Sequence, residues 1–73
     1  MHSNFTIIYE AAEEGGYTAY IPEVPGAISE GETIEEARVM VLSALEEVLE
    51  ARRDLALSKK TNRAIVESLP ISA

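Results

Sequence analysis

Glutamates are the residues in this sequence whose type and spacing come nearest to a catalytic pattern. Two-metal nucleases gather carboxylates near strand ends, and Glu10 could form such a pair with Glu23 or Glu30. None of these pairs has a diagnostic spacing. Each glutamate also lies in an expected turn or near a helix start, where it has a local structural role. A metal-dependent nuclease is therefore kept only as an alternative, and we expect no metal site.

Other catalytic chemistry has few candidate residues. Nucleophilic catalysis needs a Ser, Thr or Cys close to an activating base, and the sole histidine, His2, lies beside a terminus of the chain. The sequence has no cysteine, which removes thiol chemistry, disulfides and Cys-ligated zinc. No glycine-rich phosphate loop is present, because Gly15 and Gly16 form a turn pair and the other two glycines are isolated. The residues thus favour a binding protein over an enzyme, with no catalytic residues and no cofactor.

The acidic residues are concentrated in the first half of the chain. Residues 1–37 hold eight Glu and no Lys or Arg, a charge of −8, while the remainder carries five acids and six bases and brings the net charge to −7. Such a surface repels phosphate backbones and attracts basic proteins. Lys59, Lys60 and Arg63 form a small basic cluster without an aromatic platform or recognition helix. We therefore expect a basic protein partner and no direct nucleic-acid binding by this chain alone.

The chain length allows one small domain over residues 1–73. A chain of this size buries roughly 60% of its unfolded surface, which is marginal without disulfides or a metal. We therefore expect association, either with a partner or as a homo-oligomer (dimer or tetramer). The uncharged stretches fall far short of a membrane span, and the first residues lack the features of a signal peptide. We expect a cytoplasmic protein that does not bind membranes.

Two alternating segments near the N-terminus predict a β-hairpin. Residues 5–11 place apolar side chains, several of them aromatic or β-branched, on their odd positions. Residues 17–21 repeat the alternation after a break that contains Gly15 and Gly16. A short glycine-containing loop between two such segments is typical of antiparallel pairing.

A proline-containing turn and a helix are expected next. Pro22 and Pro25 have no N–H to donate to a sheet, so they predict an ordered turn, and a short third strand is expected at about residues 27–30. The following stretch is a helix start, because Thr33 can accept from the Glu36 N–H while the Glu36 carboxylate reaches back, forming a capping box. The helix has a wide apolar arc and an acidic opposite arc, which we interpret as its solvated outer face.

The end of the sequence predicts a fourth strand. Residues 64–69 alternate weakly and include the β-branched Ile65 and Val66. A strand that returns after a helix crosses over right-handedly and pairs in parallel with an earlier strand. The expected fold class is α+β, a small mixed sheet with the order β-β-β-α-β and one covering helix. The other sheet face is left open, which is typical of a domain that oligomerises or binds a partner.

The order of the motifs resembles the HicB family. The matching features are Gly-Gly-Tyr-x-Ala-x-x-Pro-x-x-Pro-Gly, which begins at Gly15, and Gly-x-Thr-x-x-Glu-Ala, which begins at Gly31 and opens the helix. Both lie within residues 5–50. The roles that carry over to the motif positions are structural, in the hairpin turn, the proline loop and the helix cap. These positions are Gly15, Gly16, Pro22, Pro25, Gly26, Thr33 and Glu36.

This resemblance implies a partial ribonuclease H-like fold and a role as the antitoxin of a type II toxin–antitoxin pair. In that family the HicA toxin is a small basic ribonuclease that HicB masks, and the complex often represses its own operon. The acidic first half of the chain suits such a partner. Many HicB proteins append a DNA-binding domain after the sheet domain, and this sequence resembles the short form without one.

Acids and a tyrosine beside an exposed sheet edge are the residues that we expect to contact a basic toxin. They are Glu13, Glu14, Tyr17, Glu23 and Glu30. The main alternative to the antitoxin is an orphan, oligomeric HicB-like interaction or scaffolding domain that has no toxin.

Overall fold

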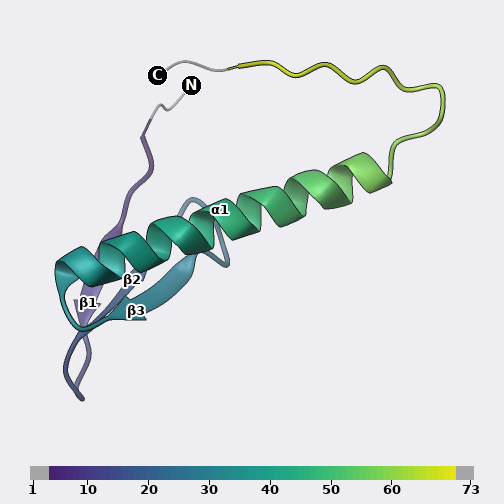
Figure 1. The fold of residues 1–73 in the computed structure, drawn as a ribbon. Helices are drawn as coiled ribbons and strands as arrows, with labels where there is room; N and C mark the ends of the chain where they lie inside the picture. The colour runs from purple at the N-terminus through teal and green to yellow at the C-terminus, as the bar shows by residue number, and fades with distance from the viewer. Residues whose placement is uncertain (1–3, 71–73) are drawn as a thin grey trace.

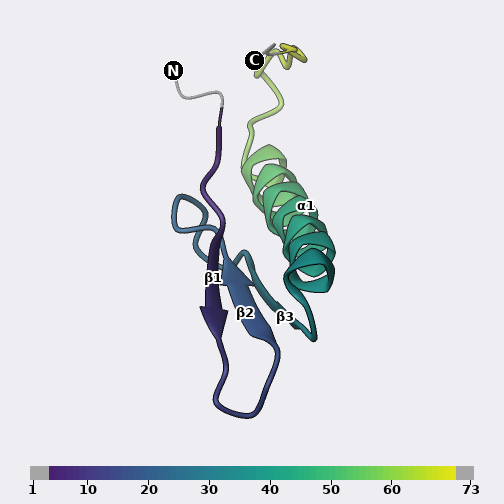
Figure 2. The same ribbon diagram turned by 90° about the vertical axis from the view of Figure 1, so that its left-hand side faces the viewer.

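Three strands and one helix make up the structure, a computed structural model that describes residues 4–70 (Figure 1). In chain order the elements are β1 (Ile8–Ala11), β2 (Tyr17–Tyr20), β3 (Ile28–Gly31) and α1 (Ile34–Ser58). The strands form one antiparallel sheet in the order β1-β2-β3. The helix packs along β3 and β2 as a second layer (Figure 2). The predicted α+β class and the predicted hairpin are confirmed.

The sheet register places alternate side chains on opposite faces. Ala19 on β2 pairs with Ser29 on β3 and is completely buried beneath the helix. The next residue, Tyr20, pairs with Ile8 and Ile28, so this apolar row lies on the face opposite the helix. Ile28 is 57% exposed there. The core between the two layers consists of Ala19, Ile21, Val24, Ala27, Ala37 and Val41.

A side-chain contact and a proline set the point where β1 begins. The Thr6 N–H donates to both carboxylate oxygens of Glu23, at 3.0 and 3.1 Å, and the Thr6 hydroxyl donates to the same carboxylate at 2.6 Å. Pro22 ends the pairing of β2, because it has no N–H to donate. The segment before β1 is therefore held by the loop after β2, and β1 begins at Ile8 rather than at residue 5.

The loop between β2 and β3 is closed by its own backbone. The Ile21 N–H donates to the Ala27 carbonyl oxygen, and the Ala27 N–H donates to the Val24 carbonyl oxygen, each at 3.0 Å. Gly26 has φ 99°, a conformation that favours glycine. The side chains of Ile21, Val24 and Ala27 are all buried. The loop thus supplies half of the residues that form the core.

The helix begins with reciprocal hydrogen bonds. The Thr33 hydroxyl oxygen accepts from the Glu36 N–H at 3.1 Å, and the Glu36 carboxylate accepts from the Glu32 N–H at 3.0 Å. The carboxylate therefore reaches one residue further back than in a standard capping box. Two N–H groups at the start of α1 are satisfied in this way.

Removing the Thr33 hydroxyl leaves the Glu36 N–H without this acceptor. We expect Thr33→Ala to lower the free energy of unfolding by about 1 kcal/mol and the thermal midpoint by about 4–8 °C, as measured by circular dichroism. Thr33→Ser keeps the hydroxyl and serves as the control, within about 0.5 kcal/mol of the parent. Equal losses in the two variants would show that the hydroxyl is not what stabilises the helix start.

The helix is much longer than the strands. Its 25 residues span about 37 Å, while a strand of 4 residues spans about 13 Å. Arg52 reaches back to the sheet layer, because its Nη2 donates to the Pro25 carbonyl oxygen at 2.8 Å. Leu55 continues the apolar side of the helix but is 58% exposed. The end of α1 therefore runs past the sheet (Figure 1).

The predicted fourth strand over residues 64–69 is wrong. Residues 60–70 contain no helix or strand and are exposed. The reason is geometric, because α1 carries the chain past the sheet and the segment doubles back above the helix, where it meets no strand edge (Figure 1). The sheet is thus antiparallel rather than mixed, and the partial ribonuclease H-like arrangement, which includes that strand, is not confirmed. His2 lies outside the described residues.

Candidate partner-binding surface

The β1–β2 turn shapes one end of the sheet. The Ala12 N–H donates to the Gly16 carbonyl oxygen at 3.0 Å, and the Gly15 N–H donates to the Ala12 carbonyl oxygen at 3.1 Å. Gly15 and Gly16 have φ values of 100° and 75°, which side chains rarely allow. A Cβ at Gly16 would also lie 2.7 Å from the Gly31 carbonyl oxygen. The glycine pair thus lets the turn pack against the end of β3.

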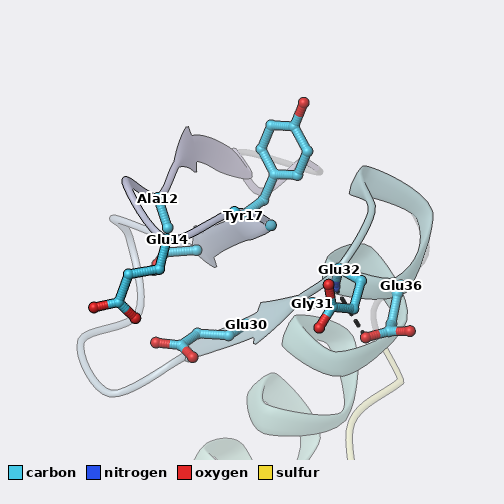
Figure 3. A pocket seen from close by; sticks show the side chains of 10 residues that line it. Ala12, Glu14, Tyr17, Glu30, Gly31, Glu32 and Glu36 are labelled. Atoms are coloured by element: carbon cyan, nitrogen blue, oxygen red, sulfur yellow. Dashed lines mark hydrogen bonds between the residues drawn. The ribbon is translucent and has the colours of Figure 1, made fainter.

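A hollow of about 280 Å³ lies between this turn and the start of α1. In Figure 3, Glu14 from the turn and Glu30 from β3 project to the same side, while the Tyr17 ring points away from them. Glu32 and Glu36 lie at the helix start. The hollow is lined by Ala12, Glu14, Gly15, Gly16, Tyr17, Thr18, Glu30, Gly31, Glu32 and Glu36.

The structure brings together three of the five residues expected to contact a partner. Glu14, Tyr17 and Glu30 line the hollow, although Tyr17 also packs against the core. Glu13 is exposed in the same turn but does not line the hollow. Glu23 lies in the loop after β2, where its carboxylate already accepts the hydrogen bonds from Thr6. Partner contact by these five residues stays a prediction.

Two further glutamates belong to the same surface. Glu10 pairs with Thr18, and Thr18 pairs with Glu30, so both carboxylates lie in one row on the sheet face opposite the helix. Glu32 lines the hollow. The sequence alone identifies neither as a partner contact, because alternation relates Glu10 to Glu30 only when the strand register is known. Glu10, Glu14, Glu30 and Glu32 are called the acidic surface below.

The acidic surface is strongly negative and open to solvent. Residues 4–33 contain six glutamates and no Lys or Arg, and all four members of the surface are exposed. Among the described residues, no hydrogen bond or ion pair engages the side chains of Glu10, Glu14 or Glu30. The neighbouring apolar row on the sheet adds contact area. Carboxylates beside apolar side chains favour a partner that presents Arg and Lys.

Three structural features are absent from residues 4–70. Within residues 4–70, no three His, Cys, Asp or Glu side chains form a group that could hold a metal ion. No buried side-chain N or O atom in this part of the chain lacks a hydrogen-bond partner. No helix in the described segment combines the length and hydrophobicity that crossing a bilayer requires. What the acidic surface supplies is negative charge, from Glu10 and Glu30 on the strands and from Glu14 and Glu32 just outside them.

Comparisons with known proteins found three relatives. The UPF0150 protein ssl0738 from Synechocystis is 41% identical over 71 residues, which cover 97% of this chain and 99% of that protein. The UPF0150 protein ssr1765 from the same organism is 38% identical over 48 residues, 66% of this chain and 61% of that protein. Antitoxin HicB 1 from Photorhabdus laumondii is 44% identical over 41 residues, 56% of this chain but 26% of the antitoxin. No family model and no solved structure matches the chain.

Proposed function

The chain belongs to the UPF0150 family of HicB-like proteins, and from this membership we propose that it is an antitoxin-like protein, which binds a toxin and catalyses no reaction. The observation that carries the proposal is the 44% identity to antitoxin HicB 1 over 41 residues. The partner we propose is a small basic HicA-type ribonuclease in the cytoplasm. Contact is made through the acidic surface, whose carboxylates match a basic partner in charge.

Neutralisation follows from competition for the same cations. A basic ribonuclease holds RNA phosphates with Lys and Arg side chains. Glu30 is fixed on β3, and Glu14 is fixed by the hydrogen-bonded β1–β2 turn. The backbone at both positions is therefore already ordered before binding, so the cost of ordering on binding is limited to the exposed side chains themselves. The acidic surface therefore occupies the cationic groove of the toxin and keeps RNA out of it.

Co-purification with the neighbouring gene product tests this proposal. We expect the tagged chain to form a stable complex with a small basic protein encoded beside it, and the complex to cleave RNA far more slowly than the isolated partner. Size exclusion measures the complex, and an RNA-cleavage assay measures the activity. If no small basic protein is encoded beside the chain, or if the complex cleaves RNA as fast as the free partner, the antitoxin proposal fails.

A homo-oligomeric HicB-like domain without a toxin is the second candidate. The exposed apolar side chains of Ile65 and Leu69, at 96% and 74%, favour it. The same purification separates the two candidates. A chain that runs alone as a dimer or tetramer, with no neighbour bound, would support the second candidate.

A further inference from the structure

The solvent-exposed surface area of this chain is larger than that of a compact protein of the same mass. It exposes 6194 Å² to solvent, whereas a compact monomer of 8.0 kDa exposes about 4,450 Å². The Cα radius of gyration is 15.7 Å, against about 11 Å for a compact domain of this length. About 1,700 Å² per chain is therefore exposed that a compact domain would bury.

Part of the exposed surface is formed by apolar side chains at the C-terminal end of the described chain. Ile65, Val66 and Leu69 are 96%, 58% and 74% exposed. Their segment, residues 64–69, has the alternation and the β-branched residues of a strand but pairs with no strand in the structure. Leu55, on the part of α1 beyond the sheet, is 58% exposed. A strand-forming segment is thus held away from its own sheet.

The sheet offers an edge that such a strand fits. β1 is an outer strand of the sheet, so the backbone N–H and C=O groups on its outer side are available for pairing. The helix packs on β3 and β2, which leaves β1 at the side of the sheet away from it (Figure 2). Phe5, just before β1, is 54% exposed. An added strand would pair with β1 and cover apolar surface beside it.

We propose that residues 64–69 of one copy add as a strand to the β1 edge of a second copy, and that the exchange is reciprocal. Arg52 holds α1 against the sheet layer, because its side chain donates a hydrogen bond to the Pro25 carbonyl oxygen. The helix therefore carries residues 64–69 past the sheet of their own chain. Each chain has one unpaired segment, residues 64–69, and one unpaired β1 edge. In a dimer with a two-fold axis, the segment of each chain pairs with the β1 edge of the other, and the assembly is closed. Burying the excess surface of both chains, about 3,400 Å², would give an interface within the range of obligate homodimers.

The oligomeric state of the full chain and of three variants tests the exchange. We expect the parent to have twice the 8.0 kDa chain mass in light scattering at micromolar concentration. Ile65→Glu and Leu69→Glu place a charge where an apolar side chain is buried, so each should weaken the dimer about 100-fold or more. Ser68→Glu adds the same charge between them and should change the dimer dissociation constant less than about 10-fold. Both apolar side chains lie outside the core, so circular dichroism should show unchanged folding.

Site-directed cross-linking distinguishes a second copy from the chain's own sheet. The sequence contains no cysteine, so two single variants with different tags, Glu10→Cys on β1 and Ser68→Cys, can be mixed without background reaction. A short bis-maleimide should yield a species that carries both tags. A monomeric parent, a dimer that survives both Ile65→Glu and Leu69→Glu, or a mixture in which no species carries both tags would each overturn the proposal.

Discussion

The double variant Glu14→Lys/Glu30→Lys should bind a basic HicA-type toxin about 100-fold or more weakly than the parent, because attraction becomes repulsion at two positions of the acidic surface. Both side chains are exposed and project to the same side (Figure 3). Neither engages another group among the described residues. The substitutions should therefore leave the thermal midpoint close to that of the parent. Calorimetry with the purified toxin measures the affinity. In the RNA-cleavage assay, the toxin should regain activity in proportion to the loss of binding.

A matched control separates the local surface from net charge. Glu46→Lys/Glu50→Lys makes the same change in net charge on the exposed outer face of α1, and it should weaken binding less than about 3-fold. The parent complex should also associate more slowly as salt is raised, since exposed charges are screened. If the helix variant weakens binding as much as the variant of the acidic surface, the toxin does not bind where we propose.

Gly31→Ala should destabilise the fold more than an alanine substitution at any of the other three glycines. A Cβ at Gly31 would lie 2.4 Å from the Ala37 nitrogen, 2.8 Å from the Ala37 Cα and 2.9 Å from the Glu36 carbonyl carbon. These are backbone atoms of the first turn of α1, so the helix start must move away from β3. We expect a loss of about 3 kcal/mol or more, and a fall in the thermal midpoint of about 12 °C or more, measured by circular dichroism.

Gly15→Ala is the control for this prediction. It adds the same methyl group, but a Cβ at Gly15 meets nothing within 4 Å. Its cost comes only from the φ of 100°, and should be about 1 kcal/mol. Because Gly31 has no positive φ, the difference between the two variants isolates steric overlap from backbone strain. Similar losses in both would contradict the close approach of β3 and α1.

The sequence was informative where structure depends on near neighbours. The hairpin follows from alternation around Gly15 and Gly16, and the helix start follows from the spacing of Thr33 and Glu36, because turn and capping preferences act over a few residues. Residues 64–69 carry an equally local strand signal, yet they form no strand. Alternation reports that a segment suits a sheet, but it does not report whether a strand edge lies within its reach.

The candidate site depends on contacts between distant parts of the chain. Glu14 and Glu30 line the same hollow because the β1–β2 turn closes onto the end of β3, a result of register and loop geometry rather than of composition. Gly31 is an isolated glycine in the sequence, and its close approach to Ala37 appears only when the helix is in place. Glu23 seemed available as an exposed loop acid, but the structure uses it to hold Thr6.

The order of the elements has a consequence for folding kinetics. Each strand pairs with the next in the sequence, and α1 packs on the two strands just before it. Such local connectivity requires only short loops to close, which is the property of rapidly folding domains. Residues 60–70 contain no helix or strand and contribute nothing to this locally connected unit. The sheet and helix can therefore fold at a rate independent of concentration, and strand exchange between copies follows as a separate, second-order step.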